Sequence, residues 1–187
     1  MVIGITGRAG VGKSYLSAHL PASQYTCLEL DIVGHEVLRL PAIIDQIITL
    51  FGPDMCRDGQ IDRQLLGGLV FGDAAALHQL NRLVHPYINT YVREFSYSRL
   101  THFVIVGALI DQIGLADFCD CMIHIDAEDH DLYESGSNPD RLRAIHGHQI
   151  SRSDYHAQAD HTFLNTFSTN TRDDWLRFFS DQINNQV

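Results

Sequence analysis

The chain has almost no lysine: twelve of its thirteen basic side chains are arginine, and Lys13 is the exception among 187 residues. It also lacks an apolar run of the roughly 18 residues that a membrane-spanning helix needs, and it carries no secretory signal pattern. We therefore expect a cytoplasmic chain with no membrane partner. Repeats and linkers are absent too, so the length predicts a single domain over residues 1–187.

Positive charge is scarce, since 23 acidic side chains face 13 lysines and arginines and the formal net charge is −10. A nucleic-acid surface needs a basic stripe that neutralises phosphates, and no such stripe exists here. We therefore expect small-molecule partners and no nucleic acid. Nothing in the sequence indicates an oligomeric state.

Cysteine is present without a metal-binding arrangement. Cys119 and Cys121 lie two positions apart, which is closer than zinc-knuckle spacing, and no second pair accompanies them. We expect reduced structural thiols. The H-x-H pair at His146 and His148 also lacks accompanying carboxylates or cysteines, so metal ligation there is the minor alternative.

The one lysine lies in Gly7-Arg8-Ala9-Gly10-Val11-Gly12-Lys13-Ser14, which matches the phosphate-binding pattern G-x-x-x-x-G-K-[ST]. The apolar, β-branched run 2–6 before it predicts a buried strand, and 14–20 predicts a helix. Strand, glycine loop and helix form the context in which this motif, the P-loop, binds nucleotides. The alternative is a glycine-rich turn without a ligand.

The motif predicts a role for each part of the loop. Its glycines allow backbone amides to approach phosphate oxygens, Lys13 should reach the β- and γ-phosphates of ATP, and the Ser14 hydroxyl should hold Mg²⁺. The ATP-binding residues predicted from the loop and the start of the helix are Gly7, Gly10, Val11, Gly12, Lys13, Ser14 and Tyr15.

Further short strands alternate with helical segments. Apolar runs at 25–30, 103–107, 122–125 and 162–164 predict four strands besides the first, and 173–183 predicts a closing helix. This alternation predicts an α/β fold with a doubly wound parallel sheet of about five strands.

The stretch from Ile32 to about Tyr97 has helical periodicity throughout, and Gly52-Pro53 and Asp58-Gly59 break it into separate helices. We therefore predict that this stretch is a helical insert over the carboxyl ends of the strands, where such sheets bind ligands. Asp31 ends the second predicted strand and should face the same crevice as the loop. It could deprotonate an attacking hydroxyl or merely cap the following helix, and its position alone leaves both roles open.

The chain resembles the dephospho-coenzyme A kinases, and the resemblance covers about residues 1–165. The runs that carry it are Ile3-Gly4-Ile5-Thr6-Gly7, the glycine loop, Leu28-Glu29-Leu30-Asp31, His35-Glu36-Val37-Leu38, Phe51-Gly52, Asp58-Gly59-Gln60-Ile61-Asp62-Arg63, Leu66, Val70-Phe71, Leu80-Asn81-Arg82-Leu83-Val84-His85-Pro86, Gln149, Ala159-Asp160 and Asn165. The run from Asp58 to Pro86 is far more selective than the loop, which by itself indicates only a nucleotide.

The resemblance implies a P-loop kinase-like fold with a core at about 1–31, 100–127 and 150–187, a substrate-binding insert at 32–99 and a short lid at 128–149. It implies transfer of the γ-phosphoryl group of ATP to the ribose 3′-hydroxyl of dephospho-CoA, the last step of coenzyme A synthesis, with Mg²⁺ as cofactor. Asp31 and Lys13 then fall on catalytic positions.

The resemblance also implies that Asp31, His35, Arg63 and His85 bind the acceptor substrate. Two of these residues have alternatives that the sequence leaves open. Arg63 could form a surface salt bridge with Asp58 or Asp62, and His85 could be a buried histidine at a helix start ahead of Pro86.

Three features depart from the family's pattern. Glu29 replaces the first aspartate of Asp-Ala-Asp, Gln112 replaces a glutamate after the third strand, and 128–140 holds five acids and no arginine where the family's lid has arginines. Such a lid should repel a triphosphate. Arg141, Arg143 and Arg152 are candidate replacements, and the first two join the predicted ATP-binding set. The alternatives are a kinase for another small acceptor, such as a nucleoside, and a degenerate ATP- or CoA-binding relative with little activity.

Overall fold

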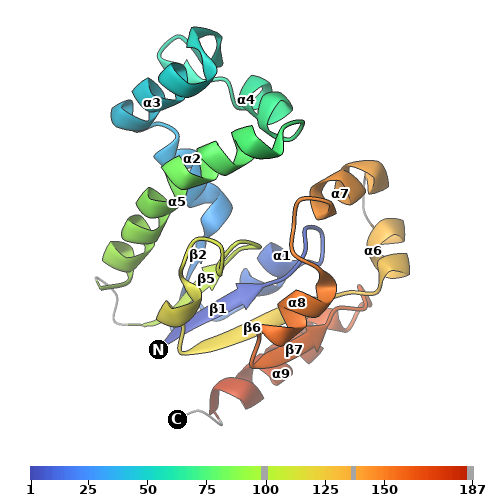
Figure 1. Cartoon of the computed structure of the whole chain (residues 1–187). Coiled ribbons are helices and arrows are strands. Elements are labelled where there is room, and N and C mark those ends of the chain that lie inside the picture. Colours follow the sequence, from blue (N-terminus) through green and yellow to red (C-terminus); the bar gives the residue numbers. More distant parts are fainter. Residues whose placement is uncertain (98–100, 136–137, 185–187) are drawn as a thin grey trace. The chain divides into compact units, whose positions relative to one another are not determined.

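The computed structural model describes residues 1–97, 101–135 and 138–184 (Figure 1). The chain divides into two compact units. The first unit consists of Met1–Glu29 and Arg99–Val187, and the second is Leu30–Ser98.

The first unit contains one five-stranded sheet whose neighbouring strands all run parallel. Its strands are β1 (Val2–Thr6), β2 (Tyr25–Glu29), β5 (His102–Val106), β6 (Cys121–Asp126) and β7 (His161–Leu164), and their order is β2-β5-β1-β6-β7. All five predicted strands are therefore confirmed, as is the doubly wound parallel sheet. The glycine loop leaves the carboxyl end of β1, the central strand.

The helices of this unit are α1 (Lys13–Ser17), α6 (Asp129–Ser135), α7 (Pro139–His146), α8 (Arg152–Ala157) and α9 (Thr171–Asn184), which follows the last strand, and there is a 3₁₀ turn at Ala116–Phe118. One face of the sheet forms the main hydrophobic core. There, Ile5 and Ile123 pack with Trp175 and Phe179 of α9 and Leu16 of α1, and all five side chains are buried. On β6, His124 alternates with Ile123 and therefore points to the other face, where Tyr155 of α8 stacks on its ring.

The second unit is mainly helical. Its elements are α2 (Leu30–Val37), α3 (Pro41–Phe51), a 3₁₀ turn (Pro53–Met55), β3 (Cys56–Arg57), β4 (Gln60–Ile61), α4 (Arg63–Val70) and α5 (Ala74–Tyr97). Helices α2, α3 and α4 all pack against α5. The break predicted at Gly52-Pro53 is confirmed, because Gly52 ends α3 with φ 98° and Pro53 opens the 3₁₀ turn.

The break predicted at Asp58-Gly59 is of a different kind. These two residues form the turn of an antiparallel hairpin between β3 and β4, not a gap between two helices. Asp58 has φ 50° and Gly59 has φ 75°, and two successive positive φ values are what a tight hairpin turn requires. The helical reading of this stretch was wrong because the strands are only two residues long, too short to show alternation.

No helix within the described residues is both long and apolar enough to cross a membrane.

The side chain of His124 is fully buried in the first unit, and neither ring nitrogen has a hydrogen-bond partner within the described part of the chain. Its ring stacks on Tyr155 with a centroid separation of 5.5 Å and meets His156 edge-on at 4.7 Å. Burial lowers the pKa of His124 to about 4, against a smaller opposing effect of the Asp126 carboxylate. The ring is therefore neutral in the native state at neutral pH.

This burial predicts a loss of stability in acid. The unfolded chain binds a proton at His124 below about pH 6.5, whereas the native chain does so only near pH 4, so the free energy of unfolding should fall by at most about 2 kcal/mol between pH 7 and pH 5. Urea unfolding at the two pH values measures this. His124→Phe keeps an aromatic ring against Tyr155 and cannot titrate, so its stability should depend less on pH. An equal pH dependence in the variant would contradict the assignment.

Candidate nucleotide-binding site

The loop after β1 depends on glycine at three positions. Gly7, Gly10 and Gly12 have φ values of 140°, 83° and 92°, which L-residues with side chains rarely adopt. A Cβ atom at Gly7 would also collide with the backbone oxygen of Ile125. The predicted loop is therefore closed tightly against β6, with its backbone bare of side chains at these points.

Lys13 is the first residue of α1, and its side chain curls back over the loop. The Nζ atom donates hydrogen bonds to the carbonyl oxygens of Gly7 (2.8 Å) and Arg8 (2.9 Å). These contacts hold the ammonium group over the glycine loop. Val11 beside it is fully buried in the core and anchors the loop from below.

Ser14 lies next to a carboxylate at the end of β2. Its hydroxyl donates to Oε2 of Glu29, the last residue of β2, at 2.8 Å, and Ser17 donates to Oε1 at 3.4 Å. The sequence analysis noted Glu29 only as a departure from the family pattern. Its place at the motif's first acidic position was the signal that could have assigned it to the site.

The Ser14–Glu29 pair fits a hard divalent cation. Mg²⁺ prefers oxygen ligands and is usually held by one or two protein oxygens together with substrate phosphates and water. Within the described residues, no three His, Cys, Asp or Glu side chains gather to form an all-protein metal cage. A metal at this site would therefore take its remaining ligands from the nucleotide and from water.

The buried amide of Asn165, just after β7, supports the loop from behind. Its Nδ2 donates to the carbonyl oxygen of Val11 at 2.9 Å, and its Oδ1 accepts from the backbone N–H of Phe167 and the hydroxyl of Thr171. A Cβ atom at Gly12 would stand 2.6 Å from Nδ2 of Asn165. The family resemblance had included Asn165 without a role, and the structure gives it one.

Gly12→Ala should destabilise the first unit by about 1–3 kcal/mol, because alanine would be strained at φ 92° and would press on the Asn165 amide. Urea unfolding measures the change. Gly68→Ala in α4 is the matched control: a Cβ there meets open space, and alanine in a helix should stabilise by up to about 1 kcal/mol. Equal stabilities of the Gly12→Ala variant and the wild type would contradict this account.

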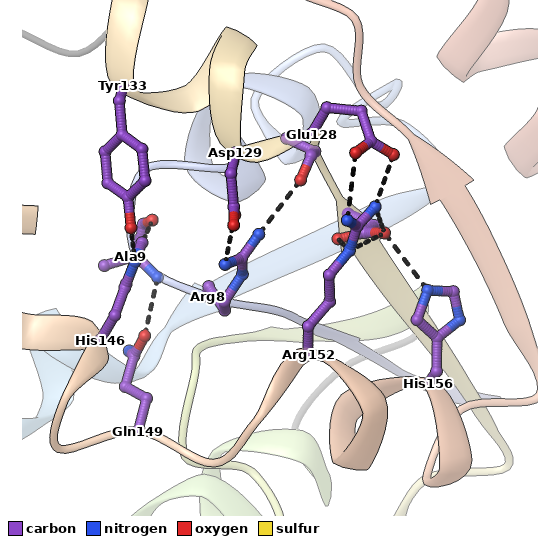
Figure 2. Close-up of polar contacts among 11 residues, drawn as sticks. Arg8, Ala9, Glu128, Asp129, Tyr133, His146, Gln149, Arg152 and His156 are labelled. Carbon is purple, nitrogen blue, oxygen red and sulfur yellow. Dashed lines mark hydrogen bonds and ion pairs between the residues drawn. The ribbon is translucent and has the colours of Figure 1, made fainter. Parts of the chain in front are cut away.

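Arg8 connects the glycine loop to the segment after β6 (Figure 2). Its guanidinium donates to Oδ1 of Asp129 at 2.8 Å and to the carbonyl oxygen of Ala127 at 3.1 Å, and only 10% of its side chain is exposed. The loop itself thus supplies an arginine to the first turn of α6, where the sequence has acids.

The peptide groups at Ala9 are held from both sides by the segment that follows α6. The Oε1 atom of Gln149 accepts from the Ala9 N–H at 3.0 Å, and Nε2 of His146 lies 2.9 Å from the Ala9 carbonyl oxygen (Figure 2). Because a carbonyl only accepts, Nε2 carries a hydrogen, and Nδ1 lies 3.0 Å from the Tyr133 hydroxyl oxygen. Asp129, His146 and Gln149 therefore hold this segment on the loop by polar contacts.

Arg152 binds two carboxylates at once. Its Nε donates to both oxygens of Asp126 at 2.9 and 2.8 Å, and its Nη2 donates to Glu128 at 2.8 Å. Burial by itself would raise the pKa of Asp126, but hydrogen bonds from Arg152 and His156 outweigh it and lower that pKa below its ordinary value. In the described conformation, Arg152 therefore has a structural role, because it holds Asp126 and Glu128 together.

Three of the five acids in residues 128–140 have an arginine partner in the structure. Glu128 pairs with Arg152, Asp129 with Arg8, and Asp140 with Arg143. These arginines lie far away in the sequence or just beyond the acidic stretch, so a count of acids within the stretch could not reveal the pairs.

The remaining predicted ATP-binding residues lie on α1 and α7. Tyr15 is 55% exposed, and its ring lies 4.6 Å from that of His19. Arg143 pairs with Asp140 at 3.0 Å and lies 4.6 Å from the centre of the Tyr133 ring. Arg141 belongs to α7, but its side chain lies outside the described residues.

The predicted substrate-side residues all belong to the second unit. Asp31 was expected to end a strand or cap a helix. It lies instead within the first turn of α2, because the helix begins at Leu30. His35 and Arg63 line one hollow, whereas His85 is not among its lining residues.

The structure also bears on two alternatives for these residues. His85 is half-buried in the interior of α5 and not at a helix start, because that helix begins at Ala74 and continues through Pro86. The partner of the Asp62 carboxylate is Arg57, at 3.5 Å. Asp62 also caps α4 by accepting from the N–H groups of Gln64 and Leu65.

The parallel sheet, the glycine loop with its lysine and the adjoining helix define a P-loop kinase fold. A family model described as dephospho-CoA kinase matches residues 1–171, and the chain belongs to this family. The dephospho-CoA kinase of Methylococcus capsulatus is 29% identical over 178 residues, 90% of this chain and 89% of that protein. That of Thermobifida fusca is 30% identical over 168 residues, 84% of each chain.

Solved structures agree on the fold. TT1252 from Thermus thermophilus aligns over 100% of this chain and 98% of that one with a TM-score of 0.82 at 23% identity. Dephospho-CoA kinase from Campylobacter jejuni aligns over 100% of this chain and 98% of that one, with a TM-score of 0.73 at 18% identity. Shikimate kinase from Bacteroides thetaiotaomicron aligns over 98% of each chain, with a TM-score of 0.57 at 13% identity. The predicted P-loop kinase-like fold is thus confirmed.

Proposed function

We propose that this protein transfers the γ-phosphoryl group of ATP to the ribose 3′-hydroxyl of dephospho-CoA, giving CoA and ADP. The observation that carries the proposal is the family match over residues 1–171 on a chain whose glycine loop is complete. Membership by itself would allow an inactive relative, but Lys13, Ser14 and the three loop glycines are all in place.

ATP and Mg²⁺ are the expected co-reactants. Gly7, Gly10 and Gly12 leave the loop backbone open to phosphate oxygens, and Lys13 supplies the positive charge above it. Ser14 and Glu29 would hold Mg²⁺, which, when bound, would neutralise charge on the β- and γ-phosphates.

The proposed chemistry is a single displacement. The acceptor oxygen forms a bond to the γ-phosphorus as the bond from that phosphorus to the β,γ-bridging oxygen breaks, and ADP leaves. We assign the hydroxyl proton to the Asp31 carboxylate, which is exposed in the first turn of α2 and thus accessible to an acceptor. The second unit corresponds to the proposed acceptor-binding insert, and residues 128–149 to the proposed lid.

The test is a coupled assay of ADP release with ATP, Mg²⁺ and dephospho-CoA, with product mass measured in parallel. We expect ADP release that requires both the acceptor and the metal, and a product one phosphoryl group heavier than the acceptor. Adenosine and shikimate serve as alternative acceptors. Release with dephospho-CoA no faster than without an acceptor would contradict the proposal, as would a preference for either alternative.

A further inference from the structure

Two consecutive residues of the glycine loop are bound by two different helices of the proposed lid (Figure 2). The Arg8 guanidinium donates to Oδ1 of Asp129, the first residue of α6, at 2.8 Å. Nε2 of His146, the last residue of α7, donates to the carbonyl oxygen of Ala9 at 2.9 Å. Neighbouring loop residues therefore bind the start of one lid helix and the end of the other.

Tyr133 connects these two helices to each other. It lies one turn after Asp129 on α6 and therefore on the same face, and its hydroxyl oxygen is 3.0 Å from Nδ1 of His146. Arg8, Asp129, Tyr133, His146 and Ala9 thus form a closed ring of contacts, which we call the loop ring. Because residues 8 and 9 are adjacent in the chain, the loop ring holds both helices at one point of the glycine loop.

Gly10, the next residue of the loop, is covered by apolar side chains of the same two helices. A Cβ atom there would stand 3.0 Å from Leu132 of α6 and 3.0 Å from Leu142 of α7. Leu132 is buried and belongs to the main hydrophobic core of the first unit. The lid helices therefore approach the loop backbone closely, and apolar packing accompanies the polar contacts of the loop ring.

The burial of Arg8 indicates a role beyond stability. Only 10% of its side chain is exposed, whereas its partner Asp129 is 63% exposed. The Nε atom of Arg8 is buried and has no hydrogen-bond partner within the described residues. Burying a guanidinium group with an unused donor costs free energy, so this ion pair is weak evidence for a stabilising contact. A function that depends on the position of α6 accounts for a charge buried at this cost.

Tyr133 also contacts Arg143, which the sequence places among the ATP-binding residues. The Arg143 guanidinium lies 4.6 Å from the centre of the Tyr133 ring, and Arg143 and His146 are three residues apart on one face of α7. The ion pair of Arg143 with Asp140 joins two exposed side chains and contributes little, so a phosphate can replace Asp140 at small cost. The loop ring thus determines where the guanidinium of Arg143 lies.

We propose that Arg8 and Tyr133 are positioning residues for ATP, and that the loop ring holds Arg143 where the phosphates of the nucleotide bind. The inference rests on the proposed function for its nucleotide and adds two residues to that site. Arg8 acts through Asp129 and α6, whereas Tyr133 acts on α7 through its hydroxyl and its ring. Nζ of Lys13 donates to the carbonyl oxygen of Arg8, so the catalytic lysine and the lid are held by the same loop residue.

Calorimetric titration with ATP and Mg²⁺, without an acceptor, tests the loop ring in Arg8→Met and Tyr133→Phe. Methionine fills the buried space without the charge, and phenylalanine keeps the aromatic ring beside Arg143 without the hydroxyl. We expect the Kd for ATP to rise about 10-fold in Arg8→Met and about 3- to 10-fold in Tyr133→Phe. The KM for dephospho-CoA in steady-state kinetics should stay unchanged. Arg177→Met is the matched control, because Arg177 is an exposed arginine on α9 of the same unit, and its variant should bind ATP like the wild type.

The double variant separates one shared ring from two independent contacts. Opening the loop ring at one point removes what the other contact maintains, so Arg8→Met combined with Tyr133→Phe should bind ATP about as weakly as Arg8→Met alone. Independent losses would multiply instead, to about 30- to 100-fold. Arg8→Lys keeps the charge and the contact with Asp129, so it should recover part of the affinity.

The outcomes separate the loop ring from the proposed function. Unchanged ATP affinity in folded Arg8→Met and Tyr133→Phe would overturn the ring, as would a multiplied loss in the double variant or equal weakening in Arg177→Met. If Arg8→Met does not fold, Asp129→Asn takes its place, since it opens the ring at an exposed side chain. If the wild type binds ATP but does not phosphorylate dephospho-CoA, the proposed function falls, and the ATP titrations still decide the ring. A wild type that does not bind ATP overturns both.

Discussion

Lys13→Ala should lower kcat by about 10³-fold or more while leaving the chain folded. Lys13 is the only lysine, and its ammonium group stands over the glycine loop through contacts with the Gly7 and Arg8 carbonyls. Removing a preorganised charge from a transferring phosphoryl group costs about 10²–10³ for one donor, and up to 10⁵ for a fully placed cation. ADP release at saturating ATP and dephospho-CoA measures the loss.

Lys13→Arg is the informative companion. It keeps the charge, but the planar guanidinium cannot replace a compact ammonium at the same place, so we expect turnover well below that of the wild type. Circular dichroism and urea unfolding of both variants show whether the fold is intact. Near wild-type turnover in a folded Lys13→Ala variant would refute the role assigned to the loop.

Asp31→Asn should reduce kcat by about 10²–10⁴-fold, the usual contribution of a positioned general base. The amide is close in size to the carboxylate but cannot take the proton of the acceptor hydroxyl. Because Asp31 lies on α2 and the loop follows β1, we expect the Kd for ATP to change little. Single-turnover measurements with preformed enzyme–ATP complex separate the chemical step from binding.

Asp45→Asn provides the matched control for Asp31. Asp45 is an exposed aspartate on α3 of the same unit, outside both the loop and the hollow that His35 and Arg63 line. The same loss of one negative charge there should leave kcat unchanged. If both variants lose activity equally, the effect is one of charge in general, and Asp31 is not the base.

The parts of the site that the sequence predicted are those built from consecutive residues. The loop from Gly7 to Ser14 is a contiguous motif between a strand and a helix, so its presence can be predicted from the local sequence. The five strands were likewise visible as short apolar runs. The hairpin at Arg57–Gln60 was not predicted, because its strands are too short for a periodic pattern to be recognised.

The contacts that complete the site depend on the tertiary fold. Arg8 meets Asp129, which lies 121 positions further along the chain, and no pattern within either stretch indicates that the two will pair. The same applies to Arg152, which the sequence analysis gave as a candidate replacement for the lid arginines and which pairs with Asp126 in the structure. Residue types can be read from a sequence, but their partners are set by which strands become neighbours.

The residues that hold the glycine loop from outside come from the far end of the chain. Gln149, His146 and Asn165 reach Ala9 and Val11 across sequence separations of 140, 137 and 154 residues. During synthesis the loop leaves the ribosome first, yet the side chains that secure it are added only after most of the chain has been made. A nascent chain therefore contains the loop sequence long before it can hold the loop in its folded conformation. We expect nucleotide affinity to appear only after β7, the last strand of the sheet, has been synthesised.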